Sequence, residues 1–355
     1  MTTLHYLHQK PTSTADIRTE NSDFIVQEIL PFSPSGEGEH HLVQIQKSGL
    51  NTNQVVDMLA KFANVHPKEV TYAGQKDKNA LTEQWFGIRI PGKDTPKWEK
   101  LNQDNLTVLQ SSRHSKKLRI GALLGNRFQL TLRNVSDIAE LEQRLALIAK
   151  SGVPNYFGEQ RFGHQGKNLT LGRNMLSGGR KVKDRKKRSL FLSAVRSNVF
   201  NLVTSHRLAQ YSTQMLAGDC VMLAGSKSFF VVEQWDETAT TRLTTKDIQL
   251  SAPLWGRGEA LAKAKAAEVE LEALQGCEQD LNGLEQAGLN QERRTLLLEP
   301  QGLKWQADNN TLVLEFILPA GSYATSILRE LVDYQDVQLV KWQQMVAEQQ
   351  ENRVD

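Results

Sequence analysis

The chain has 355 residues, 39% of them hydrophobic and 23% charged, and a formal net charge of +3; such a composition is typical of a globular protein with two domains, or with one large domain that carries an insertion. A membrane-spanning or exported protein is excluded, because no run approaches roughly 18 consecutive apolar residues and the first residues lack the pattern of a secretion signal. The two cysteines, Cys220 and Cys277, suit a reducing cytoplasm and exclude a cysteine-based zinc site, so we expect a cytoplasmic protein without a metal centre.

Apolar patterns predict a hairpin and then a helix in the first part of the chain. Residues 24–30 and 41–47 are strand-like, and the segment between them, which is rich in Pro and Gly, provides the turn. Residues 54–62 follow helix-capping Asn and Thr residues, and their apolar side chains recur at helical spacing. We therefore expect this helix to pack on the sheet that contains the hairpin.

A polar loop at residues 74–84 lies between two strand-like runs, 70–73 and 85–90. It carries one carboxylate, Asp77, between two lysines, and nearby cations favour the ionised form of a carboxyl group. An ionised carboxylate held by two strands can act as a nucleophile, a base or a counter-ion. The same residue types are common in solvated hairpin turns, and local chemistry alone favours that reading.

A second informative stretch begins at Gly125-Asn126, a dipeptide typical of turns, and continues into a strand at residues 128–132. It places the amide of Asn126 beside the ring of Phe128. An amide next to an aromatic face suits a splayed-out RNA base, which is recognised by stacking and edge hydrogen bonds. A hairpin with a core phenylalanine is the alternative. An amphipathic helix is predicted over residues 137–150.

The segment 152–158 breaks the pattern and marks the predicted domain boundary. Beyond it we expect helices around residues 192–210 and from residue 259 onward, with short strands at 220–223 and 229–232.

Near the end of the chain, residues 311–318 form a predicted buried strand, and a tight glycine turn leads from it into a helix at 324–332. Ser322 is a suitable N-cap for this helix. The arrangement would place Tyr323 at the end of the sheet, where ligands often bind.

Charge is unevenly distributed. Residues 105–136 contain no acidic residue, the stretch from 161 to 232 contains only two, and residues 233–292 are rich in Glu. The densest basic run, a predicted loop at 180–188, includes Arg180, Arg185, Lys186, Lys187 and Arg188. Separated basic stretches are the usual footprint of phosphate binding, so nucleic acid is the expected partner; an incidental solvated loop is the alternative.

Four stretches together resemble one family. They are Gly74-x-Lys76-Asp77-x-x-Ala80-x-Thr82-x-Gln84, Gly125-Asn126-x-Phe128, Val153-Pro154-Asn155-Tyr156-Phe157-Gly158-x-Gln160-Arg161-Phe162-Gly163, and Pro319-Ala320-Gly321-Ser322-Tyr323-Ala324-Thr325. In order and in spacing they resemble the tRNA pseudouridine synthase D (TruD) family over nearly the whole chain.

The resemblance implies an α+β fold, in which a mixed, largely antiparallel pseudouridine-synthase sheet with helices is interrupted by an α/β insertion domain, the TRUD domain. Residues 1–151 and 298–355 would form the two parts of the catalytic domain, and residues 152–297 the insertion. It also implies the isomerisation of a uridine in tRNA, typically uridine 13 in bacteria, to pseudouridine, without a cofactor.

The resemblance further assigns roles to single residues. Asp77 matches the aspartate nucleophile, and Asn126 and Phe128 match residues that hold the flipped uridine. Phe24 and Tyr323 match further pocket positions. At the position of Tyr323, phenylalanine is common in the family. Another residue, Arg18, falls where a basic side chain would lie beside the nucleophile and hold it ionised and oriented.

The expected partner is therefore tRNA, bound by a monomer whose basic run and Lys76 contact the RNA backbone. The alternative from another class is a non-catalytic RNA-binding or RNA-chaperone module, in which Asp77 is only a turn residue. A zinc deaminase acting on RNA is disfavoured, because the Cys and His ligands of such enzymes are missing.

Overall fold

The computed structural model describes residues 3–92 and 94–351. The chain divides into two compact units, each assembled from separate stretches of sequence. The sheet unit consists of Pro11–Leu145, Pro300–Gly321 and Leu331–Asp355, and the helix-rich unit consists of Met1–Lys10, Ala146–Glu299 and Ser322–Glu330. Two short stretches from the ends of the chain thus cluster with the central part of the sequence.

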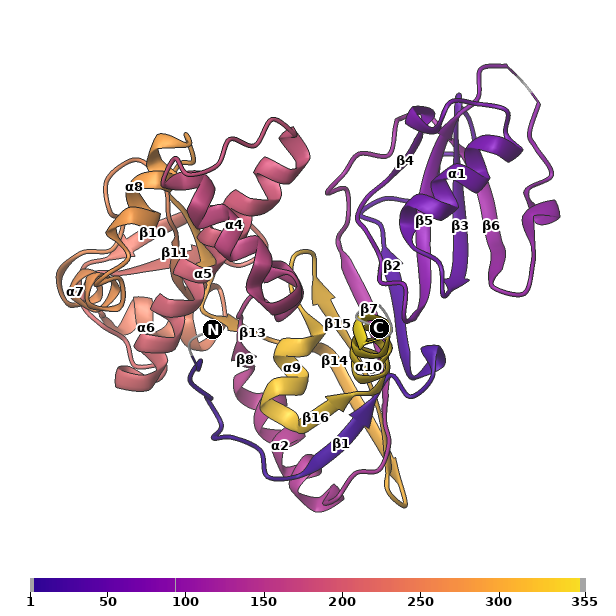
Figure 1. Cartoon of the computed structure of the whole chain (residues 1–355). Coiled ribbons are helices and arrows are strands. Elements are labelled where there is room, and N and C mark those ends of the chain that lie inside the picture. The colour runs from indigo at the N-terminus through magenta and orange to yellow at the C-terminus, as the bar shows by residue number, and fades with distance from the viewer. Residues whose placement is uncertain (1–2, 93, 352–355) are drawn as a thin grey trace. The chain divides into compact units, whose positions relative to one another are not determined.

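An eight-stranded sheet forms the body of the sheet unit (Figure 1). Its strands are β2 (Phe24–Ile29), β3 (His40–Ser48), β4 (Val70–Tyr72), β5 (Leu81–Arg89), β6 (Leu106–His114), β7 (Gly125–Leu132), β14 (Gln301–Asp308) and β15 (Thr311–Pro319). They lie in the order β14-β15-β7-β2-β5-β3-β6, with β4 paired to β5 beside this path. Neighbouring strands are antiparallel except β2 and β5, which are parallel. The expected mixed, largely antiparallel sheet is confirmed.

Strand β5 lies inside this sheet and determines where the predicted catalytic loop falls. Strand β3 pairs along all of one edge of β5. The other edge is shared, because β2 pairs with its first residues, beginning with Ile25 opposite Leu81, and β4 with its later ones, ending with Tyr72 opposite Phe86. The loop at 73–80 that joins β4 to β5 therefore returns to Leu81 beside the start of β2.

Helix α1 (Thr52–Phe62) covers part of the sheet, as its apolar spacing predicts. Asn51 and Gln54 form a capping box, in which each side chain accepts a hydrogen bond from the backbone N–H of the other residue. The helix buries Val55 and Leu59 in a cluster that includes Phe86 of β5. Each fully buried side chain of this kind contributes about 1.5–3 kcal/mol, which fixes the helix to the face of the sheet.

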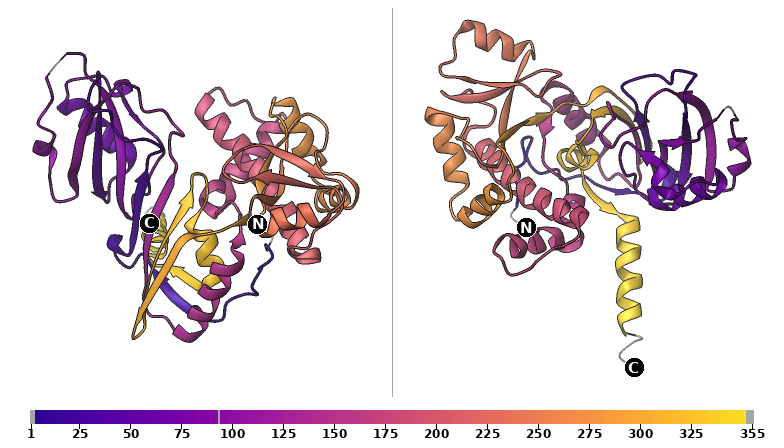
Figure 2. Two further views of the ribbon diagram at one scale, coloured as in Figure 1. Left: turned by 180° about the vertical axis from the view of Figure 1, so that it is seen from behind. Right: turned by 90° about the horizontal axis from the view of Figure 1, so that it is seen from above.

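The remaining elements of the sheet unit are short or lie at its ends. Strands β1 (Thr14–Ile17) and β16 (Asp333–Asp336) form a separate parallel pair. Helix α2 (Ile138–Ser151) begins in the sheet unit, and α10 (Val337–Glu351), which follows β16, extends away from the sheet (Figure 2, right). The 3-10 helices of the unit are η1 (Asn21–Asp23), η2 (Pro67–Glu69) and η3 (Trp98–Leu101).

The helix-rich unit contains a four-stranded antiparallel sheet in the order β10-β9-β11-β12. Its strands are β9 (Asp219–Leu223), β10 (Phe229–Val232), β11 (Ile248–Leu254) and β12 (Glu292–Thr295), and β8 (Val153–Pro154) pairs separately with β13 (Leu297–Leu298). Its helices are α3 (Glu159–Phe162), η4 (His164–Gly166), α4 (Lys167–Leu176), α5 (Arg185–Tyr211), α6 (Glu237–Thr244), α7 (Ala264–Ala273), α8 (Glu278–Gln286) and α9 (Ala324–Leu331).

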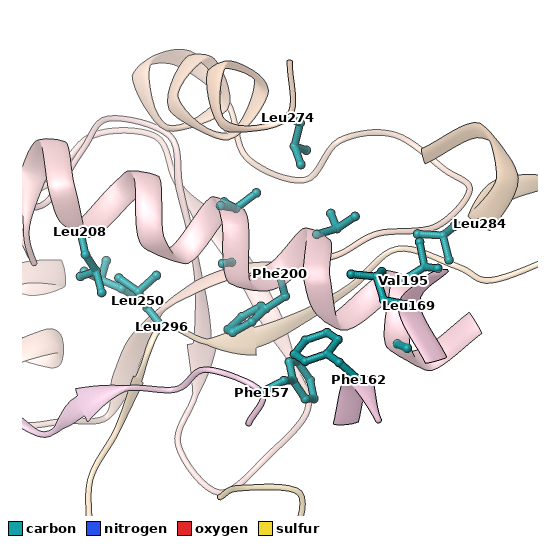
Figure 3. Close-up of a cluster of buried hydrophobic side chains, with 14 of the residues drawn as sticks. Phe157, Phe162, Leu169, Val195, Phe200, Leu208, Leu250, Leu274, Leu284 and Leu296 are labelled. Atoms are coloured by element: carbon teal, nitrogen blue, oxygen red, sulfur yellow. The ribbon is translucent and has the colours of Figure 1, made fainter. Parts of the chain in front are cut away.

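The long helix α5 organises the core of the helix-rich unit (Figure 3). Its buried face carries Val195 and Phe200, which pack in one cluster with Leu250 of the sheet and with Leu284 of α8. The ring of Phe157, from the segment before α3, lies edge-on to Phe200 with ring centroids 5.5 Å apart. This contact ties the predicted boundary segment to the core of the helix-rich unit.

The structure corrects part of the prediction that the basic run 180–188 is a loop: residues 180–184 are irregular, but residues 185–188 are helical. Asp184 is the N-cap of α5, and its carboxylate accepts hydrogen bonds from the backbone N–H groups of Lys186 (2.8 Å) and Lys187 (3.1 Å). The last four cations of the run therefore form the first turn of a helix. An aspartate cap satisfies N–H groups that a helix start leaves open, and this favours the helix despite the adjacent positive charges.

The predicted turn at Gly125-Asn126 is also wrong, because these residues begin strand β7. Asn126 lies opposite Leu318, and Gly125 opposite Pro319 of β15. A Cβ atom on Gly125 would come within 2.4 Å of the Leu318 carbonyl oxygen. The glycine is therefore required by the close approach of two strands.

Two details near the C-terminus differ from expectation as well. Strand β15 is fully buried only on alternate residues, such as Leu314 and Phe316, because the residues of its other face are partly buried or exposed. Helix α9 begins at Ala324, so Tyr323, and not the predicted cap Ser322, directly precedes it.

Within the described ranges, no helix combines the length and the apolar character that crossing a membrane requires.

Candidate active site

The carboxylate of Asp77 lies on the β4–β5 loop and is half-exposed, with 45% of its side chain accessible. Its Oδ2 atom lies 3.4 Å from Nη2 of Arg18, a side chain that is only 8% accessible. The other end of the same guanidinium, Nη1, donates to Oδ2 of Asp336 at 2.5 Å. Arg18 thus bridges two carboxylates that lie far apart in the sequence, and it leaves Asp77 open to solvent on one side.

The backbone conformation of Arg18 and a contact with an aromatic ring also define the position of its side chain. It directly follows β1 with a φ of +54°, a left-handed conformation that is uncommon for residues other than glycine and that clusters at functional sites. Its guanidinium carbon lies 4.0 Å from the centroid of the Phe24 ring, within the range of a cation–π interaction. The structure therefore brings together three of the predicted site residues: Arg18, Phe24 and Asp77.

The Phe24 ring continues into a row of aromatic side chains across neighbouring strands. Phe24 on β2 lies edge-on to Phe128 on β7, with ring centroids 6.3 Å apart, and Phe128 stacks on Phe316 of β15 at 5.4 Å. Phe24 and Phe128 are both buried. Because the Phe128 ring is covered by Phe316, it supports the wall of the site and keeps Phe24 in place.

The amide of Asn126 is oriented by a buried ion pair. Nζ of Lys76 donates to Oδ1 of Asn126 at 2.9 Å and lies 2.9 Å from Oε1 of Glu28. The other carboxylate oxygen of Glu28 accepts from the backbone N–H of Trp85 at 2.8 Å. Because an ammonium can only donate, the oxygen of Asn126 must face Lys76, and the NH₂ end of the amide points the other way.

This ion pair changes the expected role of Lys76. Its side chain is only 7% accessible and its ammonium is engaged with Glu28 and Asn126, whereas a contact with the RNA backbone was expected. A phosphate would have to displace both partners, at the cost of leaving the buried carboxylate of Glu28 unpaired. We therefore reassign Lys76 to the orientation of Asn126.

One candidate residue was missed in the sequence. Lys47 on β3 is fully buried, and its ammonium donates to the backbone carbonyls of Leu50 (2.7 Å) and Asp77 (3.0 Å). Burial lowers the pKa of Lys47 to about 8; the Asp77 carboxylate opposes this shift and the Lys76 ammonium adds to it. The sequence did contain a signal for Lys47: it is a lysine on the apolar face of a predicted strand, two residues after Ile45.

Tyr323 belongs to the helix-rich unit, and the segment 157–161 surrounds it there. Nε of Arg161 donates to the Tyr323 hydroxyl at 2.9 Å, and Phe157 lies edge-on to the Tyr323 ring with centroids 6.0 Å apart. A Cβ atom on Gly158 would lie 3.2 Å from Cδ1 of this ring. The hydroxyl of Tyr323 thus has a defined partner.

The predicted RNA-backbone residues of the basic run also lie in the helix-rich unit. Their side chains are all exposed: Arg180, Arg185, Lys186, Lys187 and Arg188. Among the residues that the structure describes, no group of three or more His, Cys, Asp or Glu side chains is placed to hold a metal ion.

Comparisons with known proteins identify what the chain is similar to. A sequence model of the family "tRNA pseudouridine synthase D (TruD)" matches residues 1–183 and 180–331. The tRNA pseudouridine synthase D of Shewanella oneidensis is 71% identical over 343 residues, which cover 97% of this chain and 92% of that protein. That of Aeromonas hydrophila is 48% identical over 334 residues, covering 94% of this chain and 95% of the relative.

A solved structure from Methanosarcina mazei, described as a tRNA pseudouridine synthase D (TruD), is similar in fold. It superposes with a TM-score of 0.73 at 24% sequence identity and covers 92% of this chain and 95% of the other. At this identity the likeness concerns the fold alone, which is the expected α+β architecture.

Proposed function

The chain belongs to the tRNA pseudouridine synthase D (TruD) family, whose members are isomerases, and from this premise we propose that it converts uridine 13 of tRNA to pseudouridine with Asp77 as the nucleophile. The observation that carries the proposal is the pairing of a half-exposed Asp77 carboxylate with the buried guanidinium of Arg18 beside the Phe24 ring. A guanidinium at this distance orients a carboxylate through a charge-assisted contact.

The reaction is an isomerisation, so its atoms balance without an oxidant or reductant. The bond between C1′ of the ribose and N1 of uracil breaks, the base turns, and a bond forms between C1′ and C5. N1 gains a proton and C5 loses one. An ionised Asp77 can assist by adding to C6 of the base or to C1′ of the sugar, and both routes need the same half-exposed carboxylate.

The neighbouring residues supply base recognition. With its oxygen turned toward Lys76, Asn126 presents an NH₂ donor, which suits a carbonyl oxygen of uracil. Phe24 and Phe128 are buried and pack against each other beside the Arg18 guanidinium, so their rings support the Arg18–Asp77 pair. Phe128 has no hydroxyl, so it cannot accept or donate the proton that C5 loses.

The same proposal extends to the organisation of the protein. Residues 1–151 and 298–355 act as the catalytic domain, and residues 152–297 act as an insertion that adds RNA contacts through its exposed basic run. The protein works as a monomer on tRNA in the cytoplasm, without a metal or an organic cofactor.

The test follows tritium release from tRNA labelled at C5 of uracil. Wild-type protein should release tritium from position 13, whereas Asp77→Asn should bind tRNA with an unchanged Kd and release none. The substitution keeps the shape of the side chain but removes its charge, so an unchanged Kd separates catalysis from binding. Release by Asp77→Ala at the wild-type rate would rule out Asp77 as the nucleophile. If the wild-type protein itself released no tritium, the result would favour an RNA-binding module.

A further inference from the structure

The buried Lys47 ammonium has no part in the chemistry described above, and its location requires an explanation. A buried charge is costly unless it is hydrogen-bonded and paired. Lys47 is 1% accessible, and the two acceptors of its ammonium are the neutral carbonyls of Leu50 and Asp77. An apolar side chain of similar length would fill the same space at a lower cost, so packing alone does not account for a lysine here.

The contacts of the β4–β5 loop show what Lys47 adds. Side chains from α1 and β5 hold the residues before Asp77: Thr52 accepts from the Lys76 backbone N–H at 3.0 Å, and Gln84 donates to the Gly74 carbonyl. The residue after Asp77 is held through the backbone N–H of Gly49, which donates to the Lys78 carbonyl at 3.1 Å. The carbonyl of Asp77 itself is bonded by the Lys47 ammonium at 3.0 Å.

We infer that Lys47 is a positioning residue for the reaction: its ammonium fixes the peptide group of Asp77, so that the carboxylate of the same residue keeps its orientation toward Arg18. This inference rests on the proposed role of Asp77. Lys47 also places a buried positive charge close to the Asp77 carboxylate.

The charge of Lys47 is therefore part of its role. The charged groups that act on it are the carboxylate of Asp77 and the ammonium of Lys76, both on the loop. Its strand partners, Thr82 on β5 and Leu106 on β6, are neutral. Since the pKa of Lys47 is lowered to about 8, the positive charge is present at neutral pH and is lost as the pH rises through about 8.

The test replaces Lys47 by methionine in the full-length protein and measures tritium release from C5-labelled tRNA. Lys47→Met should lower kcat about 100-fold, the loss expected when a reacting group is misplaced by about 1 Å, while KM stays within about twofold. Its Tm should change little, because the removal of a buried charge offsets the loss of two hydrogen bonds to backbone carbonyls. A matched control is Lys61→Met, which removes an exposed lysine from the last turn of α1 and should leave kcat unchanged.

The pH profile provides a second readout that needs no substitution. In the wild-type protein kcat should fall as the pH rises through about 8, and this fall should be absent in Lys47→Met. Lys47→Arg, which stays charged, should also lack the fall. Any of three results for Lys47→Met would overturn the inference. Its kcat could equal that of the wild type, its Tm could fall far enough to account for the lost activity, or its kcat could still fall as the pH rises through about 8. Should Asp77→Asn be active, the proposed nucleophile fails instead, whatever Lys47→Met does.

Discussion

At the scale of single residues, the chemistry of the site depends on how each charged group is held. Arg18 connects Asp77 to Asp336, which lies 318 positions after Arg18 in the sequence. The ammonium of Lys76 is bonded to Glu28 and Asn126. The loop therefore presents a half-exposed carboxylate beside two cations, Arg18 and Lys76, that are already bonded. A group held in this way needs little reorganisation when substrate arrives, which is the usual source of electrostatic catalysis.

Tyr323 offers a residue-scale prediction. Tyr323→Phe keeps the ring but removes the acceptor of Arg161 Nε. We expect the free energy of unfolding to fall by about 1 kcal/mol, the net contribution of one hydrogen bond, and kcat to change by less than about threefold, because the ring remains.

Urea unfolding and tritium release measure the two effects. A double-mutant cycle with Arg161→Met isolates the pair, since the hydrogen bond should appear as a coupling energy of about 1 kcal/mol. Strictly additive effects of the two substitutions would show that the bond does not contribute.

At the scale of elements, the placement of Asn126 and Phe128 depends on the pairing of β7 with β15. Gly125→Ala puts a Cβ atom within 2.4 Å of the Leu318 carbonyl oxygen, and the contact is with backbone, so one strand must move. We expect a loss of about 1–3 kcal/mol in the free energy of unfolding, as for other overpacked sites, and a larger loss of kcat than of tRNA affinity. A variant with wild-type kcat and Tm would show that β15 accommodates the methyl group.

The first turn of α5 provides a second element-scale prediction. Replacing Arg185, Lys186, Lys187 and Arg188 together by Gln should weaken tRNA binding and flatten its dependence on salt. Each lost phosphate contact lowers the slope of log K against log salt by about 0.7–0.9, while the chemical step stays nearly unchanged.

The fold should tolerate this change. Positive charges at a helix N-terminus oppose the helix dipole, so their removal is expected to be neutral or stabilising, and Asp184 still caps the helix. Lys227→Gln, at an exposed site in the same unit, is the control and should leave the slope as it is. An unchanged slope in the fourfold variant would mean that this turn points away from RNA.

At the scale of the whole molecule, Glu140 links the N-terminal segment to α2. Its carboxylate accepts from the backbone and hydroxyl groups of Thr12, from the Ser13 backbone N–H, and from Arg144. Burial raises the pKa of Glu140, but these hydrogen bonds outweigh it and lower the pKa to about 2. Glu140 therefore stabilises the fold fully above about pH 4.5, and this contribution is lost as the pH falls toward 2.

The corresponding prediction concerns Glu140→Gln. At pH 7 it should reduce the free energy of unfolding by about 2 kcal/mol, as for hydrogen bonds to a charged group, and the difference from wild type should shrink as the pH is lowered from 5 to 3. Urea unfolding across this range measures it. Glu142→Gln, on the exposed face of the same helix, should show no such trend, and a constant difference for Glu140→Gln would exclude the proposed linkage.

The sequence by itself determined the type and order of most elements, since alternation, helical spacing and capping residues are local signals. It also singled out Asp77, Asn126, Phe128 and Tyr323, because their residue types lie in stretches that resemble one family. Where local signals competed, the prediction failed: Gly125-Asn126 looked like a turn, and residues 185–188 looked like the end of a loop.

Only the tertiary structure decided the partners of these residues. The bond from Arg18 to Asp336, the ion pair of Lys76 with Glu28, and the bond from Lys47 to the Asp77 carbonyl all join segments that are separate in the chain. Strand pairing brings such segments together, and the low accessibility of the resulting site then fixes which charges must pair. A local sequence pattern predicts neither the strand pairing nor the burial of the site, because both depend on which strands become neighbours.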